Sequence, residues 1–492
     1  MAQRLAAASW DSESFAFMRT TLGTPENCLR VVVVGSGPAG FYAAEALLHA
    51  GLAVEVDVLE RLPVPYGLVR FGVAPDHPKL KAVTTAFAGI AKDERTRYCG
   101  NVALARDVSV DELAAMYHAV VIATGADGEQ LLNIEGENLD GVHAARDFVG
   151  WYNGHPEYAS LSFDLSGEIA AIIGQGNVAI DVCRILAKPV DELRRTDIAE
   201  HALDTLARSR VRQIRIIGRR GPVQAKFTPK ELRELGSLPG WRPVIDPAAL
   251  QFNEASRVEL QKPTATNEQK NVAILKAFAG RPLEGNRPIY LDFQQAPVAL
   301  NGGDRLRHVI LERQRLEGGP MAQVASPTGE RSALPVDLLF RSVGYRGTDI
   351  CGLPFDERRG VIRNREGRIV DGSGERLLRM YATGWIKRGC TGIIGTNRMC
   401  SDETIARLIE DLPRLEAPRP GRSALSEKLH LMGQKVVSFD DWLAIERAEV
   451  DRGRARQKVA EKFVRVGDML GVIFPPPDVG GSAGIERTTC CD

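Results

Sequence analysis

The chain has 492 residues, too many for one hydrophobic core, so we expect two or three domains. Hydrophobic residues make up 44% and charged residues 26%, as in a soluble globular protein, and no apolar run reaches the ~18 residues of a transmembrane helix. Basic and acidic residues both number 63, so the formal net charge is zero and no general attraction to nucleic acid or membranes is indicated.

The eight cysteines argue against several classes of protein. They form no Cys-x-x-Cys pair and no cysteine–histidine cluster with zinc spacing. We therefore expect no metal site, no iron–sulfur cluster bound by this chain and no disulfide scaffold. A reducing compartment fits best, and we expect the cytoplasm. The adjacent Cys490 and Cys491 are interpreted as inert, with a redox role as the alternative.

The first 29 residues precede the first predicted strand. They lack the long apolar stretch of a secretory signal. Acidic Asp11 and Glu13 count against an organelle transit peptide, although import into an organelle stays open. The simplest interpretation is a frayed leader.

A strand–helix–strand unit opens the folded part of the chain. Residues 30–34 are a β-branched run suited to a strand buried on both faces. The turn Gly35-Ser-Gly37-Pro-Ala39-Gly40 follows, and then a helix over 41–50 and a strand over 54–59. This order predicts one βαβ unit of a parallel sheet.

The glycine-rich turn has the residues of a dinucleotide site. Gly35 permits the tight turn, Gly37 lets the backbone approach a pyrophosphate, and Gly40 lets helix and strand pack closely. The helix N-terminus attracts the phosphates. Glu60 ends the second strand, where a carboxylate accepts hydrogen bonds from ribose hydroxyls and repels a 2′-phosphate. The pattern predicts FAD or NAD, not NADP; the alternative is a chance glycine-rich loop.

A second unit of the same kind begins at residue 169. A strand over 169–173 leads into the turn at 174–179, GQGNVA, and a helix over 180–187. The partner strand, 213–217, follows a charged helical excursion over 188–210.

The second unit ends in a pair of arginines instead of an acid. Arg219 and Arg220 carry guanidinium groups, which match a 2′-phosphate and can stack on adenine. We therefore predict NADP(H) here, the alternative being a solvated arginine turn. Two nucleotide sites in one chain predict hydride transfer between the cofactors. Because no Cys-x-x-Cys follows the first unit, electrons are expected to leave the flavin without a disulfide relay.

The remaining segments complete these two units. Apolar strands at 119–125 and 380–384 both end in Ala-Thr-Gly. Residues 241–335 are expected to add strands and loops to the second domain. After residue 411, Pro and Gly mark a linker into a C-terminal helical extension, and the tail at 475–492 is predicted to be disordered.

Several long strings resemble one family, the adrenodoxin reductase-like ferredoxin–NADP+ reductases. The longest is PVPYGLVRFGVAPDHPK at 63–79. The others are FVGWYN at 148–153, GQGNV at 174–178, GRRGP at 218–222, KELRE at 230–234, SVGY at 342–345 and GWIKRG at 384–389. The resemblance runs from about residue 29 to about residue 410.

The resemblance implies an α/β fold with two Rossmann-like domains, in which the NADP-binding domain is inserted in a discontinuous FAD-binding domain. We expect the FAD domain at 1–125 and 346–492 and the NADP domain at 126–345. The resemblance also implies an enzyme that passes a hydride from NADPH to FAD and then single electrons to a ferredoxin-type iron–sulfur protein.

The resemblance further implies which residues contact the cofactors. For FAD these are Ala39, Glu60, Leu68, Leu104, Trp385, Gly392, Ile393 and Ile394. For NADP they are Gln175, Gly176, Asn177, Val178, Arg219, Arg220, Glu231 and Gly392.

His77 and Asp181 are the candidate catalytic residues, as polar groups near the nicotinamide. A structural turn histidine and a carboxylate that complements a helix dipole are the alternatives. Hydride transfer itself needs no proton donor, so either residue would tune or position.

The flavin environment is expected around residues 385–402. Gly392 and Gly395 precede a helix predicted from residue 402 to 412, whose N-terminus would favour the anionic reduced ring. Trp385 either covers the flavin or packs in the core. Cys390 stands where the family has Pro, and residues 398–401 also depart from its pattern.

Three hypotheses follow. The first is a ferredoxin reductase, whose acidic partner would dock on basic residues such as Arg233 or the group Arg208, Arg210 and Arg212; solvated helix faces explain these arginines equally well. The second is a flavin subunit that delivers electrons to a companion enzyme, against which the absence of an N-terminal cysteine-cluster domain argues. The third is a non-catalytic nucleotide-binding protein. The oligomeric state is left open, and a monomer is compatible with the sequence.

Overall fold

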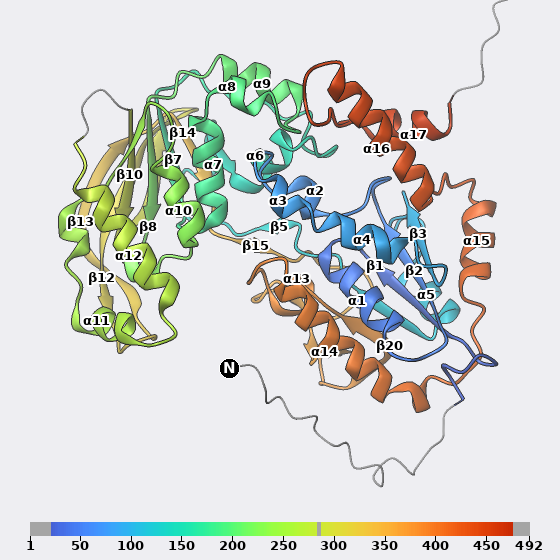
Figure 1. The fold of residues 1–492 in the computed structure, drawn as a ribbon. Coiled ribbons are helices and arrows are strands. Elements are labelled where there is room, and N and C mark those ends of the chain that lie inside the picture. The colour runs from blue at the N-terminus through green and yellow to red at the C-terminus, as the bar shows by residue number, and fades with distance from the viewer. Residues whose placement is uncertain (1–20, 283–286, 476–492) are drawn as a thin grey trace, which may run out of the picture.

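The computed structural model describes residues 21–282 and 287–475, which build two α/β domains (Figure 1). The first domain contains a seven-stranded sheet in the order β18-β19-β20-β4-β1-β2-β3. Five strands run parallel, and β18 and β19 form an antiparallel edge. The strands are β1 (Leu29–Val34), β2 (Val54–Glu60), β3 (Thr96–Gly100), β4 (Ala119–Ile122), β18 (Asn364–Arg365), β19 (Arg368–Val370) and β20 (Arg376–Ala382).

Both faces of this sheet are buried because its central strands are apolar on both sides. In β1, Val31 and Val33 belong to one core with α1, α4, α14 and α16, whereas Val32 and Val34 belong to another with α5 and α15. These helices span Pro38–Leu48 (α1), Thr84–Ala91 (α4), Val110–Met116 (α5), Thr396–Glu410 (α14), Arg422–Leu431 (α15) and Phe439–Arg454 (α16).

The second domain contains a six-stranded parallel sheet in the order β6-β14-β7-β8-β10-β9. Its helices α6, α7, α10 and α12 pack on one face, and a three-stranded antiparallel sheet packs on the other. The parallel strands are Val142–Ala144 (β6), Ile169–Ile173 (β7), Gln213–Gly218 (β8), Trp241–Val244 (β9), Arg287–Phe293 (β10) and Leu338–Arg341 (β14). The antiparallel strands are Gln295–Gly302 (β11), Leu306–Glu317 (β12) and Val324–Pro335 (β13).

Helices of the second domain include Ala145–Tyr152 (α6), Asn177–Ala187 (α7), Val190–Leu193 (α8), Glu200–Ala207 (α9), Pro229–Leu235 (α10), Glu254–Gln261 (α11) and Thr266–Ala279 (α12). The predicted helical excursion after α7 is therefore present as α8 and α9.

Two short strands join the domains. β5 (Gly128–Glu129) leads out of the first domain and pairs antiparallel with β15 (Tyr345–Arg346), which leads back. The second domain is thus inserted in the first, as Figure 1 shows by the blue and orange segments that share one domain. This confirms the predicted fold class of two Rossmann-like domains. The domain boundaries stay a prediction.

The C-terminal segment connects the two domains a second time. After α16 the chain runs to α17 (Val466–Ile473), and residues between these helices contact the loop between α8 and α9 and the start of α9 in the second domain. Lys462 Nζ lies 2.9 Å from Asp197 Oδ2, and Lys81 Nζ, from the first domain, lies 2.7 Å from the same atom. Lys458 Nζ lies 3.2 Å from Glu200 Oε2. We call these five residues the Asp197 cluster.

Burial has opposite outcomes for the pKa values of two members of the Asp197 cluster, Lys462 and Asp197. It lowers the pKa of Lys462 to about 7, assisted by repulsion from Lys81. Against the effect of burial, Lys462 and Lys81 hold the pKa of Asp197 well below its ordinary value. Asp197 therefore stays ionised between two cations that belong to the first domain and the C-terminal segment.

One predicted element begins elsewhere. The helix expected from residue 402 starts six residues earlier, at Thr396, directly after Gly395. Polar residues outnumber Met399 and Cys400 in its first two turns, so the apolar pattern typical of a helix begins only farther along. The predicted frayed leader falls mostly at residues 1–20 and the predicted disordered tail at 476–492, and both stretches lie outside the described residues, as do Cys490 and Cys491.

Candidate nucleotide-binding sites

The first glycine-rich turn lies at the carboxyl end of β1, where α1 begins. Gly35 has φ of +112°, and a Cβ there would meet Ala123 O at 2.5 Å. A Cβ on Gly40 would lie 1.9 Å from Gly35 O, so only glycine allows the helix to pack this closely. Gly37 faces open space, and no side chain caps the helix N-terminus that it precedes. The free N–H groups and the open approach suit a pyrophosphate.

Glu60 lies beside this turn at the end of β2. Its Oε2 accepts hydrogen bonds from Ser36 N at 3.2 Å and Ser36 Oγ at 2.6 Å, and Oε1 accepts one from Leu62 N at 3.1 Å. Each carboxylate oxygen has more than one acceptor position, so the group can still receive ribose hydroxyls. These hydrogen bonds hold the carboxylate in place beside the turn.

Two loops bring further predicted residues to the same edge. Tyr66 and Gly67 both have positive φ, and a Cβ on Gly67 would lie 3.2 Å from Gly37 Cα. Leu68, at the start of α2 (Leu68–Phe71), is therefore next to the turn and 37% exposed. The loop that carries Leu104 begins with a hydrogen bond from Val102 N to Glu60 O.

The segment after β20 reaches the turn from the other side. Gly384 has φ of +73°, and a Cβ there would lie 2.5 Å from Ala39 Cβ. Trp385 begins α13 (Trp385–Arg388), donates its indole N–H to Thr391 O at 3.2 Å and stacks on Tyr345 with a centroid distance of 5.8 Å. The structure thus places Trp385 between the domains, against the returning strand β15.

Gly392, Ile393 and Ile394 lie just before α14. Gly392 has φ of +83°, and Thr396 Oγ1 accepts a hydrogen bond from Ile393 N at 3.1 Å. Ile393 is 68% exposed, whereas Ile394 packs against the core of the first domain. No side chain caps the N-terminus of α14, but the carbonyls of residues 393–395 accept its first three backbone N–H groups, so an anionic ring would meet the positive end of the helix dipole and not free donors.

The positions that depart from the family pattern support this arrangement. Ser401 Oγ donates a hydrogen bond to Ala39 O at 2.9 Å, and Gly384 N donates one to Cys400 Sγ at 3.3 Å. Burial raises the pKa of the Cys390 thiol to about 11, so the thiol stays protonated at neutral pH. Ser401 thus ties α14 to α1, and Cys400 ties α14 to the segment after β20.

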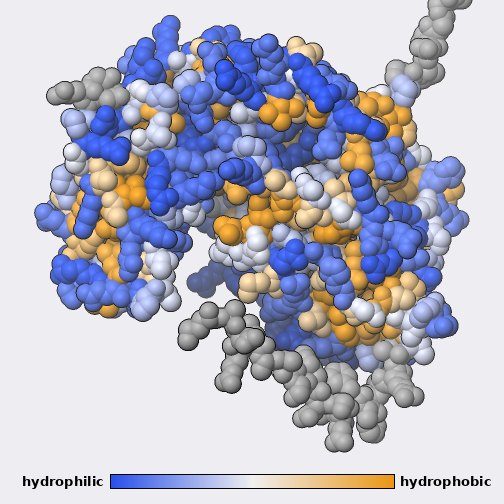
Figure 2. Space-filling view, in the orientation of Figure 1, coloured by the Kyte–Doolittle hydropathy of each residue, from blue (hydrophilic) through white to orange (hydrophobic). Residues whose placement is uncertain are grey.

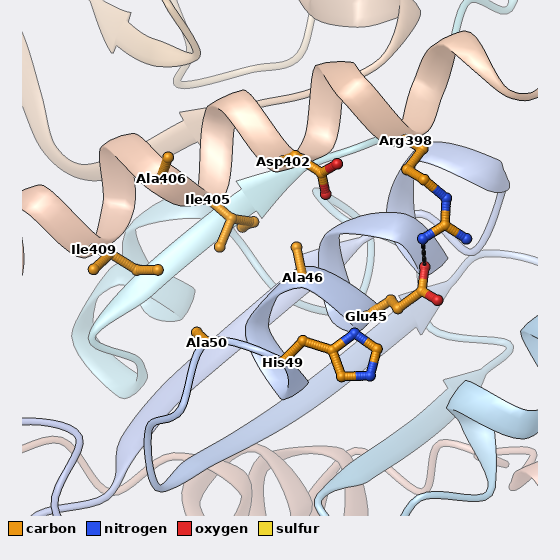
Figure 3. A pocket seen from close by; sticks show the side chains of 9 residues that line it. All are labelled: Glu45, Ala46, His49, Ala50, Arg398, Asp402, Ile405, Ala406 and Ile409. Carbon is orange, nitrogen blue, oxygen red and sulfur yellow. Dashed lines mark ion pairs between the residues drawn. The ribbon is translucent and has the colours of Figure 1, made fainter. Parts of the chain in front are cut away.

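A hollow of about 390 Å³ lies between α1 and α14 (Figure 3). Arg398 pairs with Glu45 at 2.6 Å at one end of this hollow and lies over the Tyr42 ring. The other lining residues, among them Ala50 and Ile409, lie toward the C-terminal ends of both helices. The hollow is therefore separate from the edge where the two helices begin.

The second glycine-rich turn has the same construction in the inserted domain. Gly174 has φ of +130°, and a Cβ there would meet Ser342 O at 2.1 Å. Gly176 faces open space at the uncapped N-terminus of α7. Gln175 Nε2 donates to Asp292 O at 3.0 Å, and Asn177 Oδ1 accepts from Thr228 N at 2.8 Å. Val178 packs against the domain core.

Arg219 and Arg220 follow β8 at the same edge, and Arg219 is exposed. Burial and repulsion from Arg219 lower the pKa of Arg220. A bound anion would therefore offset the repulsion between the two guanidinium groups. Glu231, on α10, is 8% exposed, and its Oε2 is buried without a hydrogen-bond partner among the described residues. A bound hydroxyl or amide would satisfy this oxygen.

The two candidate catalytic residues meet where the domains face each other. His77 ends the loop before α3 (Pro78–Lys81), and its Nε2 lies 2.9 Å from Glu234 Oε2 on α10. His77 Nδ1 lies 4.0 Å from Asp181 Oδ1 on α7. Burial raises the pKa of Asp181 to about 6, against the opposing charges of Arg184 and His77. The structure thus brings both candidates into one cluster.

Four members of this cluster were not predicted as site residues: Asp76, Arg184, Lys188 and Glu234. Arg184 Nη1 lies 2.8 Å from Asp181 Oδ1, and its Nη2 pairs with Asp76 Oδ2. Asp181 and Arg184 are one helical turn apart, which the sequence could have indicated. Asp76 and Glu234 lie in other segments, and only the fold brings them to α7. We call Asp76, His77, Asp181, Arg184, Lys188 and Glu234 the Arg184 cluster.

Two unlike nucleotide sites therefore lie in neighbouring domains (Figure 2 shows the hollow between the two lobes). The first has an acid at the end of its second strand and fits the ribose of FAD, while the second has two arginines and fits a 2′-phosphate. This arrangement defines a flavin- and pyridine-nucleotide-dependent oxidoreductase. Consistently, the family model of pyridine nucleotide-disulphide oxidoreductases matches residues 29–217.

Comparison with known proteins narrows the class. The chain is 44% identical to NADPH:adrenodoxin oxidoreductase, mitochondrial, of Bos taurus, over 92% of this chain and 93% of that protein. It is 41% identical to NADPH-ferredoxin reductase FprA of Mycobacterium tuberculosis, over 90% and 98%. The structure of Mycobacterium tuberculosis FprA in complex with NADPH superposes with a TM-score of 0.84 at 40% identity, covering 90% of this chain and 98% of that one. The chain belongs to the family of NADPH:adrenodoxin and NADPH-ferredoxin reductases.

Proposed function

We propose that the protein is a ferredoxin–NADP+ reductase that passes a hydride from NADPH to FAD and then single electrons to a ferredoxin-type iron–sulfur protein. One observation carries this proposal: an acid-marked nucleotide site lies in one domain, an arginine-marked site lies in the other, and the two domains contact each other through His77 and Asp76. The likeness to FprA and to the adrenodoxin oxidoreductases supports the direction of electron flow from NADPH.

The residues that would hold FAD lie at one edge of the first sheet. Gly35, Gly37 and Gly40 and the α1 N-terminus would bind the pyrophosphate, and Glu60 the ribose. Leu68, Leu104, Trp385 and Gly392 to Ile394 would surround the rest of the cofactor. FAD would supply the step from a two-electron donor to a one-electron acceptor.

The residues that would hold NADPH lie at the matching edge of the second sheet. Gln175, Gly176, Asn177 and Val178 would bind the pyrophosphate at the start of α7. Arg219 and Arg220 would bind the 2′-phosphate, and the unpaired oxygen of Glu231 would accept a hydrogen bond.

Asp181 and His77 would act on charge rather than as proton donors. A nicotinamide that gives up a hydride becomes positively charged, and an ionised carboxylate nearby favours that change. Burial raises the pKa of Asp181 to about 6, which is still below neutral pH, so its carboxyl group is largely ionised at pH 7. His77, held by Glu234 at 2.9 Å, keeps its place between the two acids.

The arginines predicted to dock an acidic partner lie at two separate places in the second domain. Arg233 is exposed on α10, next to Glu234 at the domain interface, and we propose it as a docking residue. Arg208, Arg210 and Arg212 precede β8 and so lie at the amino ends of the parallel strands, opposite the nucleotide edge. We therefore propose that this arginine group lies away from the electron-transfer site and outside the dock.

Anaerobic mixing of the flavin-loaded protein with NADPH tests the proposal. The flavin absorption band should bleach, and NADH should bleach it far more slowly. Absence of bleaching would mean a nucleotide-binding protein without turnover. Steady-state NADPH oxidation against a panel of ferredoxins then separates an independent reductase from a flavin subunit that needs a companion enzyme.

We retain the proposal of one domain at 1–125 and 346–492 and a second domain at 126–345. The pairing of β5 with β15 next to both proposed boundaries supports it.

For the location we propose a reducing compartment, the cytoplasm or an organelle interior, supported by six free cysteines in the described chain. No helix of the described residues is long and apolar enough to cross a membrane. Cell fractionation tests the location.

A further inference from the structure

Arg184 lies at the centre of the Arg184 cluster, and its side chain is only 3% exposed. It contacts three carboxylates from three segments of the chain. Asp76 belongs to the loop of the first domain, Asp181 to α7 and Glu234 to α10. Lys188 Nζ adds a second cation, 2.7 Å from Asp76 Oδ2.

The atoms that Arg184 binds are the atoms that face His77. Glu234 Oε2 lies 3.0 Å from Arg184 Nε and 2.9 Å from His77 Nε2. Asp181 Oδ1 lies 2.8 Å from Arg184 Nη1 and 4.0 Å from His77 Nδ1. Both carboxylate oxygens that face the imidazole ring are therefore held by one guanidinium group.

We propose that Arg184 is a positioning residue for hydride transfer, which holds His77 and Asp181 in place and ties the Asp76 loop of the FAD-side domain to the NADP-side domain. This inference rests on the proposed function. It goes beyond the two candidate residues because Arg184 acts through them and through the relative placement of the two nucleotide sites.

The side chain chemistry suits this task. A guanidinium group is planar, always charged and carries five N–H donors, so it can bind three carboxylates at once, which an ammonium on a flexible stem cannot do in a fixed geometry. Arg184 also holds the pKa of Asp76 below its ordinary value, together with Lys188 and against burial. Asp76 therefore stays ionised beside Arg184 and Lys188 at the domain interface.

Arg184→Gln and Arg184→Lys test the inference, with Arg257→Gln as the matched control. Arg257 also pairs with an acid three residues earlier, Glu254, but on the exposed surface of α11. In the flavin-loaded protein, the limiting rate constant for flavin reduction by NADPH should fall about 10- to 100-fold in Arg184→Gln, since misplacing reacting groups by about 1 Å can cost about 100-fold. Arg184→Lys should restore only part of this loss, and Arg257→Gln should match the wild type.

Two further measurements separate positioning from a general loss of structure. The dissociation constant of NADP+ should stay within about threefold of the wild type, since the fingerprint and the arginine pair are untouched. Hydrogen exchange of residues 74–82 should become faster in Arg184→Gln, because their tie to α7 and α10 is lost. The second readout does not depend on turnover.

The pH profile of flavin reduction provides a readout that a purely structural role would not move. The groups that interact directly with Asp181 are Asp76 and His77 from the first domain, Tyr152 from α6, Arg184 from α7, Glu231 from α10 and Tyr345 from β15. Lys188 and Glu234 contact its neighbours Asp76 and Arg184. Removing the Arg184 charge disfavours the ionised carboxylate, so the inflection should move to higher pH in Arg184→Gln. Arg257→Gln should leave it in place.

If Arg184→Gln does not fold, Asp76→Asn cuts the same tie while it leaves Arg184 paired with Asp181 and Glu234. It should also slow flavin reduction and speed hydrogen exchange of residues 74–82. The inference is overturned if both variants reduce flavin at the wild-type rate, or if only the affinity for NADP+ changes. Failure of the wild type itself to bleach with NADPH would instead refute the proposed function.

Discussion

The two ionic clusters join the same two domains but differ in their charge and their openness. In the Arg184 cluster, three acids share two cations and a histidine, and one acid has a pKa raised to about 6. In the Asp197 cluster, Asp197 is held between two lysines, and Lys462 is buried with a pKa lowered to about 7. The comparison shows that the two clusters of one interface differ in their role. The Arg184 cluster sets the charge beside the proposed nucleotide sites, and the Asp197 cluster holds the two domains together near α9.

Breaking the Asp197 cluster should have the largest effect, and we expect that effect on the stability of the fold. Asp197→Asn leaves the buried Lys462 and the half-buried Lys81 without their shared acid, which costs up to about 3–5 kcal/mol in the free energy of unfolding. A thermal unfolding scan should show a clear fall in Tm. Glu254→Gln, in an exposed pair, should leave Tm unchanged. A Tm of Asp197→Asn equal to the wild type would remove the fastening role.

Replacing one arginine of the pair should affect only the binding of NADPH. Arg220→Gln removes a charged hydrogen-bond donor from the proposed 2′-phosphate site, which is worth about 1.5–3 kcal/mol, or about 10- to 100-fold in KM for NADPH. KM for NADH and Tm should change little, because NADH lacks the 2′-phosphate.

Steady-state assays with both nucleotides check this prediction. Equal losses for NADPH and NADH would assign Arg220 to another part of the nucleotide. Arg257→Gln again serves as the control for removing an arginine from this domain.

Changing Asp181 should alter the pH dependence. The carboxyl group is neutral well below pH 6 and ionised well above it, and the ionised form favours hydride donation. The wild-type rate constant for flavin reduction should therefore rise about tenfold with increasing pH through about 6, a change of about 1.4 kcal/mol in the barrier. Asp181→Asn should lack the rise and stay near the low-pH value.

Stopped-flow measurements between about pH 5 and 8 check this profile. Asp197→Asn, if folded under the assay conditions, should keep the wild-type inflection, because the Asp197 cluster does not contact the Arg184 cluster. An inflection that persists in Asp181→Asn would transfer the titration to another group.

The smallest effect is expected at the rim. Arg233→Gln removes one exposed charge beside the domain interface and should raise KM for ferredoxin about two- to fivefold, with no change for a small dye. Arg208→Gln, at the opposite end of the sheet, is the matched control and should leave both values unchanged. An unchanged KM in Arg233→Gln would remove this residue from the dock.

Local patterns predicted the parts of the site that one segment can build. Both glycine-rich turns, Glu60 and the arginine pair were visible because strand, turn and helix follow one another in the chain. The fold class and the family also followed from the sequence. These features need only the spacing of residues within a βαβ unit.

The rest depends on contacts between distant segments. Arg184 binds Asp76 across 108 positions, and Lys462 meets Asp197 only because the C-terminal segment returns to the inserted domain. Arg208, Arg210 and Arg212 looked like a dock until the direction of β8 placed them at the far edge. The start of α14 was missed because its first turns are mostly polar.

The pairing of β5 with β15 has a mechanical consequence. Both crossings of the chain lie side by side, so the inserted domain is carried on a single two-strand stalk. A domain connected only by two paired strands can rotate about them, and such rotation would change the distance over which a hydride is transferred. Beside the Arg184 cluster, the C-terminal segment supplies a further point of attachment at Asp197 and Glu200, which restricts the movement of the inserted domain.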